Sequence, residues 1–264
     1  MRLTDLMSKQ LITIDVNDSV RNALMLMQKK KVSRLLVRKN KEIVGILTER
    51  DLARRLGSEK ERKLSDAHIH VSSCYTKHLL TADKGEDVKA VARKMLEYGI
   101  SSVAVADQWK VIGLVTKTDL IKLLENSDEQ IEKIMTKNVK RIEVGSRLLE
   151  ARRMMLHYGI KRLVVTDKDK LVGIITESDI AKALGLFRKV SEGKHWEEKM
   201  RGILVDDAMT SAVLTLKPTD KVGACVRLML DKDISGIPVV DGEEIKGIVT
   251  KTDLVKALVM DSKL

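Results

Sequence analysis

Apolar and polar positions follow one pattern that occurs four times along the chain. Each copy has a short apolar segment, an amphipathic segment, and two apolar runs separated by a polar turn. In the first copy Val20, Ala23, Leu24 and Met27 recur at the spacing of one helical face. We therefore expect each copy to fold as strand, helix, strand, strand, helix, which predicts an α+β protein.

The amphipathic face recurs in the other copies with one exception. The equivalent apolar sets are Val88, Val91, Ala92 and Met95 in the second copy and Val222, Cys225, Val226 and Met229 in the fourth. The third copy has Arg152 at a position that is apolar elsewhere.

The second apolar run of each copy ends in a signature of Gly, two apolar residues, Thr, two variable residues and Asp. The four signatures start at Gly45, Gly113, Gly173 and Gly247. A β-branched run that leads into an amphipathic stretch is typical of a strand followed by a helix. Each signature therefore places a hydroxyl and a carboxylate at the start of a helix.

The spacing within the copies is constant. From Met7 to Gly45 is 38 positions, and the same interval separates three other pairs, Tyr75 and Gly113, Met135 and Gly173, Met209 and Gly247. Constant spacing identifies one module used four times. We expect four repeats, 1–64, 65–128, 129–190 and 191–264.

Repeats 1 and 3 differ from repeats 2 and 4 in two ways. The variable signature residues are Glu-Arg and Glu-Ser in repeats 1 and 3, but Lys-Thr in repeats 2 and 4. Net charges of the four repeats are +8, −1, +6 and −2. The alternation suggests a pair of repeats duplicated once, as 1–128 and 129–264.

These motifs resemble tandem cystathionine-β-synthase (CBS) domains, and the resemblance covers essentially the whole chain. It rests on the four signatures, the Met-Thr type of opening, and the segment Ile234-Ser235-Gly236-Ile237-Pro238-Val239-Val240. The resemblance implies two Bateman modules, each a pair of repeats packed through their sheets. In the gamma subunit of AMP-activated protein kinase, four such repeats form a flat pseudo-symmetric disc.

The resemblance also implies a regulatory ligand: AMP, ADP, ATP or S-adenosylmethionine, held in clefts between paired repeats. In the family the signature Asp accepts hydrogen bonds from the ribose hydroxyls, while the Thr and the helix start face the phosphate. Carboxylates suit a vicinal diol, and helix N-termini suit anions. The corresponding residues are Thr48, Asp51, Thr116, Asp119, Thr176, Asp179, Thr250 and Asp253.

A structural role for the same residues stays open. Thr-x-x-Asp before an apolar run is close to a capping box, in which both side chains bond to backbone N–H groups. Basic residues before the central strand separate the repeats further. In the kinase gamma subunit this region supplies basic phosphate ligands, so the resemblance implies that Arg34 and Arg162 bind phosphate. Repeats 2 and 4 lack a base there.

The leading hypothesis is a non-catalytic protein that senses energy state through an adenosine-containing ligand and signals to a partner protein. No nucleophile–base set, phosphate-binding Gly-rich loop or metal-ligand cluster is evident, so we expect neither catalysis nor a bound metal. A homodimer is left open.

The alternative is an RNA- or ribosome-binding regulatory factor that uses the basic repeats 1 and 3. Against it, the six aromatic residues leave little for base stacking. No apolar run has the length of a membrane span or an export signal, so the cytoplasm is the expected compartment.

Overall fold

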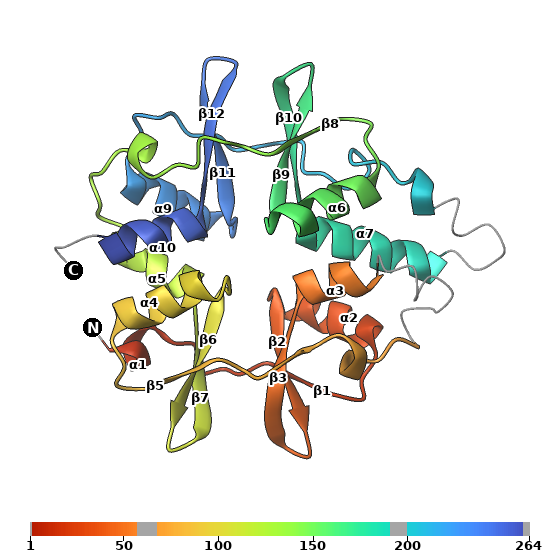
Figure 1. Ribbon diagram of the computed structural model, residues 1–264, viewed down its shortest axis with the longest axis vertical. Helices are drawn as coiled ribbons and strands as arrows, with labels where there is room; N and C mark the ends of the chain where they lie inside the picture. Colours follow the sequence, from red (N-terminus) through yellow and green to blue (C-terminus); the bar gives the residue numbers. More distant parts are fainter. Residues whose placement is uncertain (1, 57–67, 191–199, 261–264) are drawn as a thin grey trace. The chain divides into compact units, whose positions relative to one another are not determined.

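The computed structural model describes residues 2–56, 68–190 and 200–260, and it confirms the α+β class (Figure 1). Repeat 1 contains β1 (Thr13–Asp15), α2 (Val20–Lys30), β2 (Arg34–Lys39), β3 (Glu42–Thr48) and α3 (Glu49–Leu56). Repeat 2 contains β5 (Thr81–Asp83), α4 (Val88–Glu97), β6 (Ser102–Asp107), β7 (Lys110–Thr116) and α5 (Lys117–Ile121). Repeat 3 contains β8 (Arg141–Glu143), α6 (Leu148–Tyr158), β9 (Arg162–Asp167), β10 (Lys170–Thr176) and α7 (Glu177–Val190). Repeat 4 contains α9 (Val222–Asp231), β11 (Gly236–Asp241), β12 (Glu244–Thr250) and α10 (Lys251–Met260). Two short elements precede or join the repeats, α1 (Leu3–Leu6) and β4 (Thr76–Lys77).

The sheets are small and built alike. In repeats 1 to 3 a first strand pairs in parallel with the central strand, which pairs antiparallel with the signature strand through one bulge. The helix α2, α4 or α6 connects the two parallel strands of its repeat, because parallel strands need a long crossover connection.

The expected first strand of repeat 4 forms only an isolated parallel bridge between Leu216 and Val239. In repeat 1 the N–H of Leu36 donates to the carbonyl of Ile12 and extends the ladder. The equivalent residue in repeat 4 is Pro238, which has no N–H to donate. The expectation of a full strand was therefore wrong at this repeat.

The chain divides into two compact units that interleave along the sequence. Unit 1 comprises 1–11, 80–139 and 213–264, and unit 2 comprises 12–79 and 140–212. Each unit has its own apolar core, built from repeats 2 and 4 in unit 1 and from repeats 1 and 3 in unit 2.

The opening segment of each repeat packs on the signature strand of its sequence neighbour. The four pairs are Met7 on Gly113, Tyr75 on Gly45, Met135 on Gly247 and Met209 on Gly173. A Cβ at Gly45 would overlap the carbonyl oxygen of Thr76, so this glycine is required by close approach of another segment. Repeats 1 and 2, and likewise 3 and 4, thus exchange their opening segments.

No helix in the described part of the chain combines the length and the apolar character needed to cross a bilayer.

Candidate functional site

The four signatures adopt the same local geometry at the start of α3, α5, α7 and α10. In each, the Thr N–H donates to Oδ2 of the Asp at 2.9 Å, and the Thr hydroxyl donates to the same oxygen at 2.6–2.8 Å. The Asp N–H lies 3.3–3.4 Å from the Thr Oγ1. The capping role is therefore present in every repeat. A ligand role would have to use the second carboxylate oxygen, Oδ1.

The surroundings of Oδ1 differ between the repeats. Asp253 accepts a hydrogen bond on Oδ1 from the hydroxyl of Thr136 at 3.0 Å. Asp119 has Lys122 Nζ at 3.4 Å from Oδ1. Among the residues that the structure describes, Oδ1 of Asp51 and of Asp179 accepts no hydrogen bond. The carboxylates of repeats 1 and 3 thus keep a free acceptor.

The predicted basic residues lie beside the hydroxyls of the same two repeats. In the antiparallel ladders Arg34 is the direct partner of Thr48, and Arg162 is the direct partner of Thr176. Side chains of directly opposed residues lie on the same face of a sheet, with Cβ atoms about 5 Å apart. At this position repeats 2 and 4 have Ser102 and Gly236.

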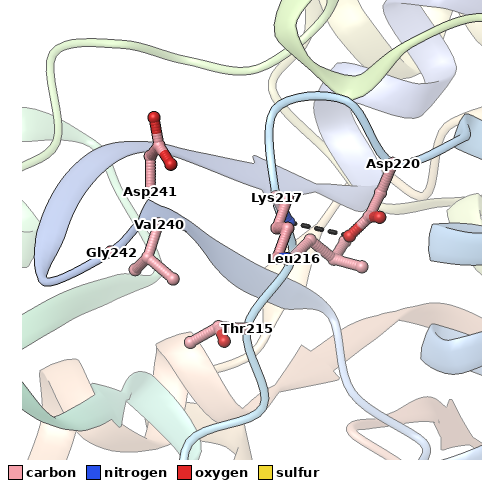
Figure 2. A pocket seen from close by; sticks show the side chains of 7 residues that line it. All are labelled: Thr215, Leu216, Lys217, Asp220, Val240, Asp241 and Gly242. Carbon is pink, nitrogen blue, oxygen red and sulfur yellow. Dashed lines mark hydrogen bonds between the residues drawn. The ribbon is translucent and has the colours of Figure 1, made fainter.

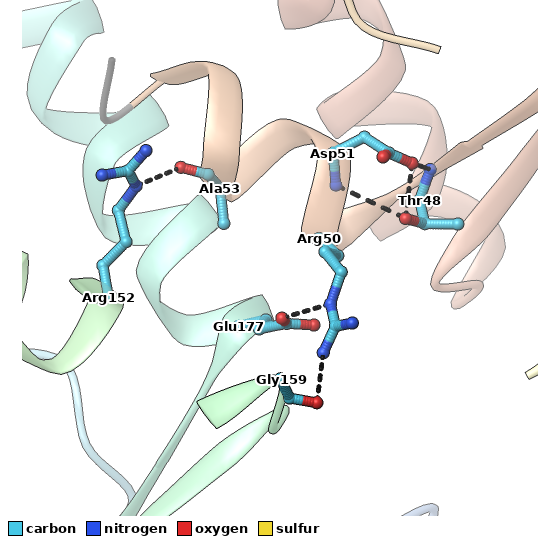
Figure 3. Close-up of polar contacts among 7 residues, drawn as sticks. All are labelled: Thr48, Arg50, Asp51, Ala53, Arg152, Gly159 and Glu177. Carbon is cyan, nitrogen blue, oxygen red and sulfur yellow. Dashed lines mark hydrogen bonds and ion pairs between the residues drawn. The ribbon is translucent and has the colours of Figure 1, made fainter. Parts of the chain in front are cut away.

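Unit 2 brings together the signatures of the basic repeats 1 and 3, because the N-terminal turns of α3 and α7 meet. Ser178 donates to Glu49 Oε1 at 2.7 Å. Arg50 Nε donates to Glu177 Oε1 at 2.6 Å (Figure 3). Arg50 also reaches the carbonyl of Gly159 at 3.4 Å. The variable residues of one signature therefore bond to those of the other.

Burial shifts the pKa of both glutamates at this junction. Burial raises the pKa of Glu49, and the hydrogen bond from Ser178 and the charges of Lys182 and Arg34 oppose that rise in part. Burial likewise raises the pKa of Glu177 against the attraction of Arg50, with Lys161 and Arg162 contributing. The predicted phosphate ligands Arg34 and Arg162 are thus electrostatically linked to the junction.

In unit 1 the variable residues of the two signatures also bond to each other, but these residues are Lys and Thr. Lys117 Nζ donates to Thr252 Oγ1, and Lys251 Nζ donates to Thr118 Oγ1, both at 2.9 Å. The sequence shows that Glu and Lys alternate at the first variable position of the signatures, but it does not reveal the cause. The first variable residue of each signature contacts the second variable residue of the repeat that shares its unit.

Arg152, which interrupts the apolar face of α6, contacts the end of a helix in another repeat. Its guanidinium donates to the carbonyl of Ala53 at 2.9 Å and to that of Arg54 at 2.7 Å, in the last turn of α3 (Figure 3). The last carbonyls of a helix lack partners within the helix, and a cation there also complements the helix dipole. This contact explains the departure from the apolar pattern.

Two hollows in the described surface lie away from the signature Thr and Asp residues. An open pocket of about 500 Å³ is lined by Thr215, Leu216, Lys217, Asp220, Val240, Asp241 and Gly242 (Figure 2). It lies at the turn end of the β11–β12 hairpin, whereas Thr250 is at the opposite end of β12. The second, beside Arg50 and Arg152, encloses only about 10 Å³ and cannot hold a nucleotide.

Comparison with known proteins matches the CBS domain family model to four segments: 3–58, 71–126, 131–186 and 205–260. Protein MJ1225 of Methanocaldococcus jannaschii is 30% identical over 94% of this chain and 95% of its own length. In the crystal structure of MJ1225, described as a proposed archaeal homologue of γ-AMPK, 97% of this chain superposes with a TM-score of 0.85 and 26% identity, covering 99% of that chain. A conserved protein from Pyrococcus horikoshii shares the fold, with a TM-score of 0.64 and 24% identity over 98% of this chain and 100% of its own.

Proposed function

The chain belongs to the CBS domain family, and we propose that it is a non-catalytic regulatory protein that binds an adenosine-containing ligand at its signatures. The family predicted from the four signatures is confirmed by this match. AMP, ADP, ATP and S-adenosylmethionine are the candidate ligands. The bound ligand would report energy state to a partner protein.

The observation that carries the proposal is the free acceptor in repeats 1 and 3. Oδ2 of Asp51 and of Asp179 is used in capping, which fixes the carboxylate and leaves Oδ1 without a hydrogen-bond donor among the described residues. An ionised carboxylate oxygen has the lone pairs to accept both hydroxyls of a ribose. Arg34 and Arg162, on the same sheet faces as the capping Thr residues, would add bidentate donors for a phosphate.

The description of MJ1225 supports the ligand class and the sensing role. That protein is presented as a proposed homologue of γ-AMPK, and its structure aligns with nearly the whole of this chain. The exchanged opening segments support 1–128 and 129–264 as the two Bateman modules. We assign the phosphate-bearing ligands to repeats 1 and 3 and expect weaker binding in repeats 2 and 4.

Calorimetric titration of the nucleotide-free chain with AMP, ADP, ATP and S-adenosylmethionine tests the proposal. Asp51→Asn and Asp179→Asn should each weaken one binding event by about 10- to 100-fold, because a hydrogen bond to a charged group is worth about 1.5–3 kcal/mol. Asp253→Asn, the matched control, should leave those events unchanged. The absence of binding of all four ligands to the unmodified chain would refute the proposal.

The role assigned to the arginines can be tested separately. Arg34→Ala should weaken binding of ATP more than binding of S-adenosylmethionine, since only ATP offers a polyphosphate. Arg38→Ala is the control, because Arg38 lies exposed on the same strand. Equal losses for both ligands, or equal effects of both variants, would count against phosphate recognition by Arg34.

Binding of RNA through its phosphate backbone is the second candidate function, favoured by the division of charge between the units. Unit 2 has 30 Lys and Arg against 19 Asp and Glu, whereas unit 1 has 19 of each. The whole net charge of +11 therefore belongs to unit 2. Such a concentration of positive charge attracts polyanions by counterion release.

A fluorescence anisotropy titration with single- and double-stranded RNA at several salt concentrations tests this candidate. Replacing the exposed lysines Lys29, Lys30 and Lys31 of unit 2 by Gln should weaken binding and lower its salt dependence. Replacing Lys110, Lys217 and Lys256 of unit 1 should change neither. Equal effects of the two sets, or no binding at low salt, would reject a dedicated RNA surface.

A further inference from the structure

Among the described residues, the signature of repeat 4 differs from the other three in that its carboxylate accepts a hydrogen bond from the hydroxyl of an opening segment. Asp253 is only 6% exposed, whereas Asp51, Asp119 and Asp179 are half-buried. Its Oδ2 accepts from Thr250, as in every repeat, and its Oδ1 accepts from the hydroxyl of Thr136. Both oxygens that could meet a ribose thus have internal donors.

Thr136 belongs to the exchanged opening segment of repeat 3. Its backbone forms a two-way bridge with Ile248, each N–H donating to the other's carbonyl at 3.0 Å, and Met135 covers Gly247 beside it. The bridge fixes the backbone of Thr136 but leaves its side-chain torsion free to rotate. The hydroxyl can therefore be turned away from Asp253 without unpairing the segment.

The other repeats provide built-in comparisons. The residues equivalent to Thr136 all carry a hydroxyl: Ser8 beside Leu114, Thr76 beside Ile46, and Thr210 beside Ile174. Within the described residues, none of these three hydroxyls bonds to a signature Asp, and that of Ser8 donates to the carbonyl of Gln10 at 3.5 Å. Within the described residues, the same backbone arrangement thus gives a hydroxyl–Asp bond in repeat 4 alone.

We infer that Thr136 sets the ligand specificity of the repeat 4 signature by occupying Asp253 in place of a ribose hydroxyl. This inference rests on the proposed function, because it concerns the same adenosine-containing ligands. A ligand that places both ribose hydroxyls on Oδ1 of Asp253 must displace the Thr136 hydroxyl, so its affinity is reduced relative to repeats 1 and 3. Thr136 is a positioning residue, since it acts through Asp253 rather than through the ligand's base or phosphate.

Thr136→Val keeps the shape of the side chain and removes its hydroxyl. Titration with AMP should then show binding at repeat 4 that is about tenfold tighter, or a binding event that the unmodified chain lacks. The event must disappear in the double variant Thr136→Val with Asp253→Asn. Thr210→Val, which removes a hydroxyl that contacts no signature Asp, should leave the titration unchanged, and so should Thr136→Ser, which keeps the donor.

The outcomes separate the two proposals. If the unmodified chain binds AMP but Thr136→Val gains no affinity, or gains it independently of Asp253, the inference about Thr136 is wrong and the proposed function stands. If neither the unmodified chain nor Thr136→Val binds any of the four adenosine ligands, the proposed function fails and this inference fails with it. Thermal unfolding of each variant identifies a loss of fold, in which case Thr136→Ala repeats the test with a smaller side chain.

Discussion

Removing the guanidinium of Arg152 should lower the free energy of unfolding of unit 2. The size of this loss can be worked out from the contacts of the side chain. The side chain donates two hydrogen bonds, at 2.9 and 2.7 Å, to the last carbonyls of α3. Hydrogen bonds to charged groups contribute about 1.5–3 kcal/mol each, and a cation at a helix C-terminus adds about 0.3–1 kcal/mol. The sum of these contributions is about 3–7 kcal/mol. Because Arg152 is half-buried and water can reach the freed carbonyls, we expect the loss to fall below that sum. Arg152→Ala should therefore cost about 2–3 kcal/mol.

Two further substitutions at Arg152 separate capping from packing. Arg152→Lys keeps the charge but cannot donate to both carbonyls in a fixed fork, so about half of the loss should remain. Arg152→Leu installs the residue type that repeat 1 has at the equivalent Leu24. If the position needed only an apolar side chain, Leu would be as stable as Arg. We expect Leu to stay below the unmodified chain.

Urea denaturation followed by circular dichroism measures the loss, and hydrogen exchange of the peptide 49–56 localises it to α3. The local measurement is needed because a chain with two compact units does not guarantee a two-state transition. Arg153→Ala is the matched control: Arg153 is the exposed neighbour on α6, and its loss should stay within about 0.5 kcal/mol. Equal stability and equal exchange for Arg152→Ala and Arg153→Ala would refute the capping role.

Three other predictions follow from burial and close packing. Burial raises the pKa of Glu177 in the folded chain, so this carboxyl favours folding at low pH and loses that contribution as the pH rises through the raised pKa. Glu177→Gln should therefore flatten the pH dependence of the unfolding free energy above the ordinary glutamate pKa of about 4.3. Gly45→Ala should lower the melting temperature, because a Cβ meets the backbone of Thr76, and unchanged melting would contradict the close approach. Burial raises the pKa of Cys225 to about 12, so iodoacetamide near pH 8 should leave it unmodified in the folded protein by mass spectrometry, and rapid alkylation would contradict its burial.

The repeating unit was predictable from the sequence because it depends on local periodicity. The helix face that begins at Val20 and the signature strands appear where the pattern places them, and Asp87 caps α4 by accepting from the N–H of Ala90. The interleaving of the units was not predictable in this way. It depends on contacts between segments that are distant in sequence, such as Met135 on Gly247.

Some tertiary contacts nevertheless correspond to visible features of the sequence pattern. Arg152 broke an apolar face because it caps a helix in another repeat. The alternation of Glu and Lys in the signatures reflects which repeats share a unit, as the Lys117–Thr252 bond illustrates. By contrast, the hydroxyl beside each signature strand is present in all four repeats, so sequence alone could not reveal that, in the part of the chain that the structure describes, Thr136 is the one that bonds to a signature Asp.

The four signatures are alike because most of their residues have a role in folding rather than in ligand binding. Thr and Asp cap a helix in every repeat, Gly admits a neighbouring segment, and the two variable residues join repeats within a unit. None of these constraints differs enough to make one repeat bind a phosphate and another not. The differences lie outside the signature, opposite the Thr, where Arg34 and Arg162 contrast with Ser102 and Gly236, and in the opening segment. We therefore expect ligand preference to follow from those flanking positions. Exchanging Arg34 with Ser102 should then exchange the phosphate preference of repeats 1 and 2 while both signatures stay intact.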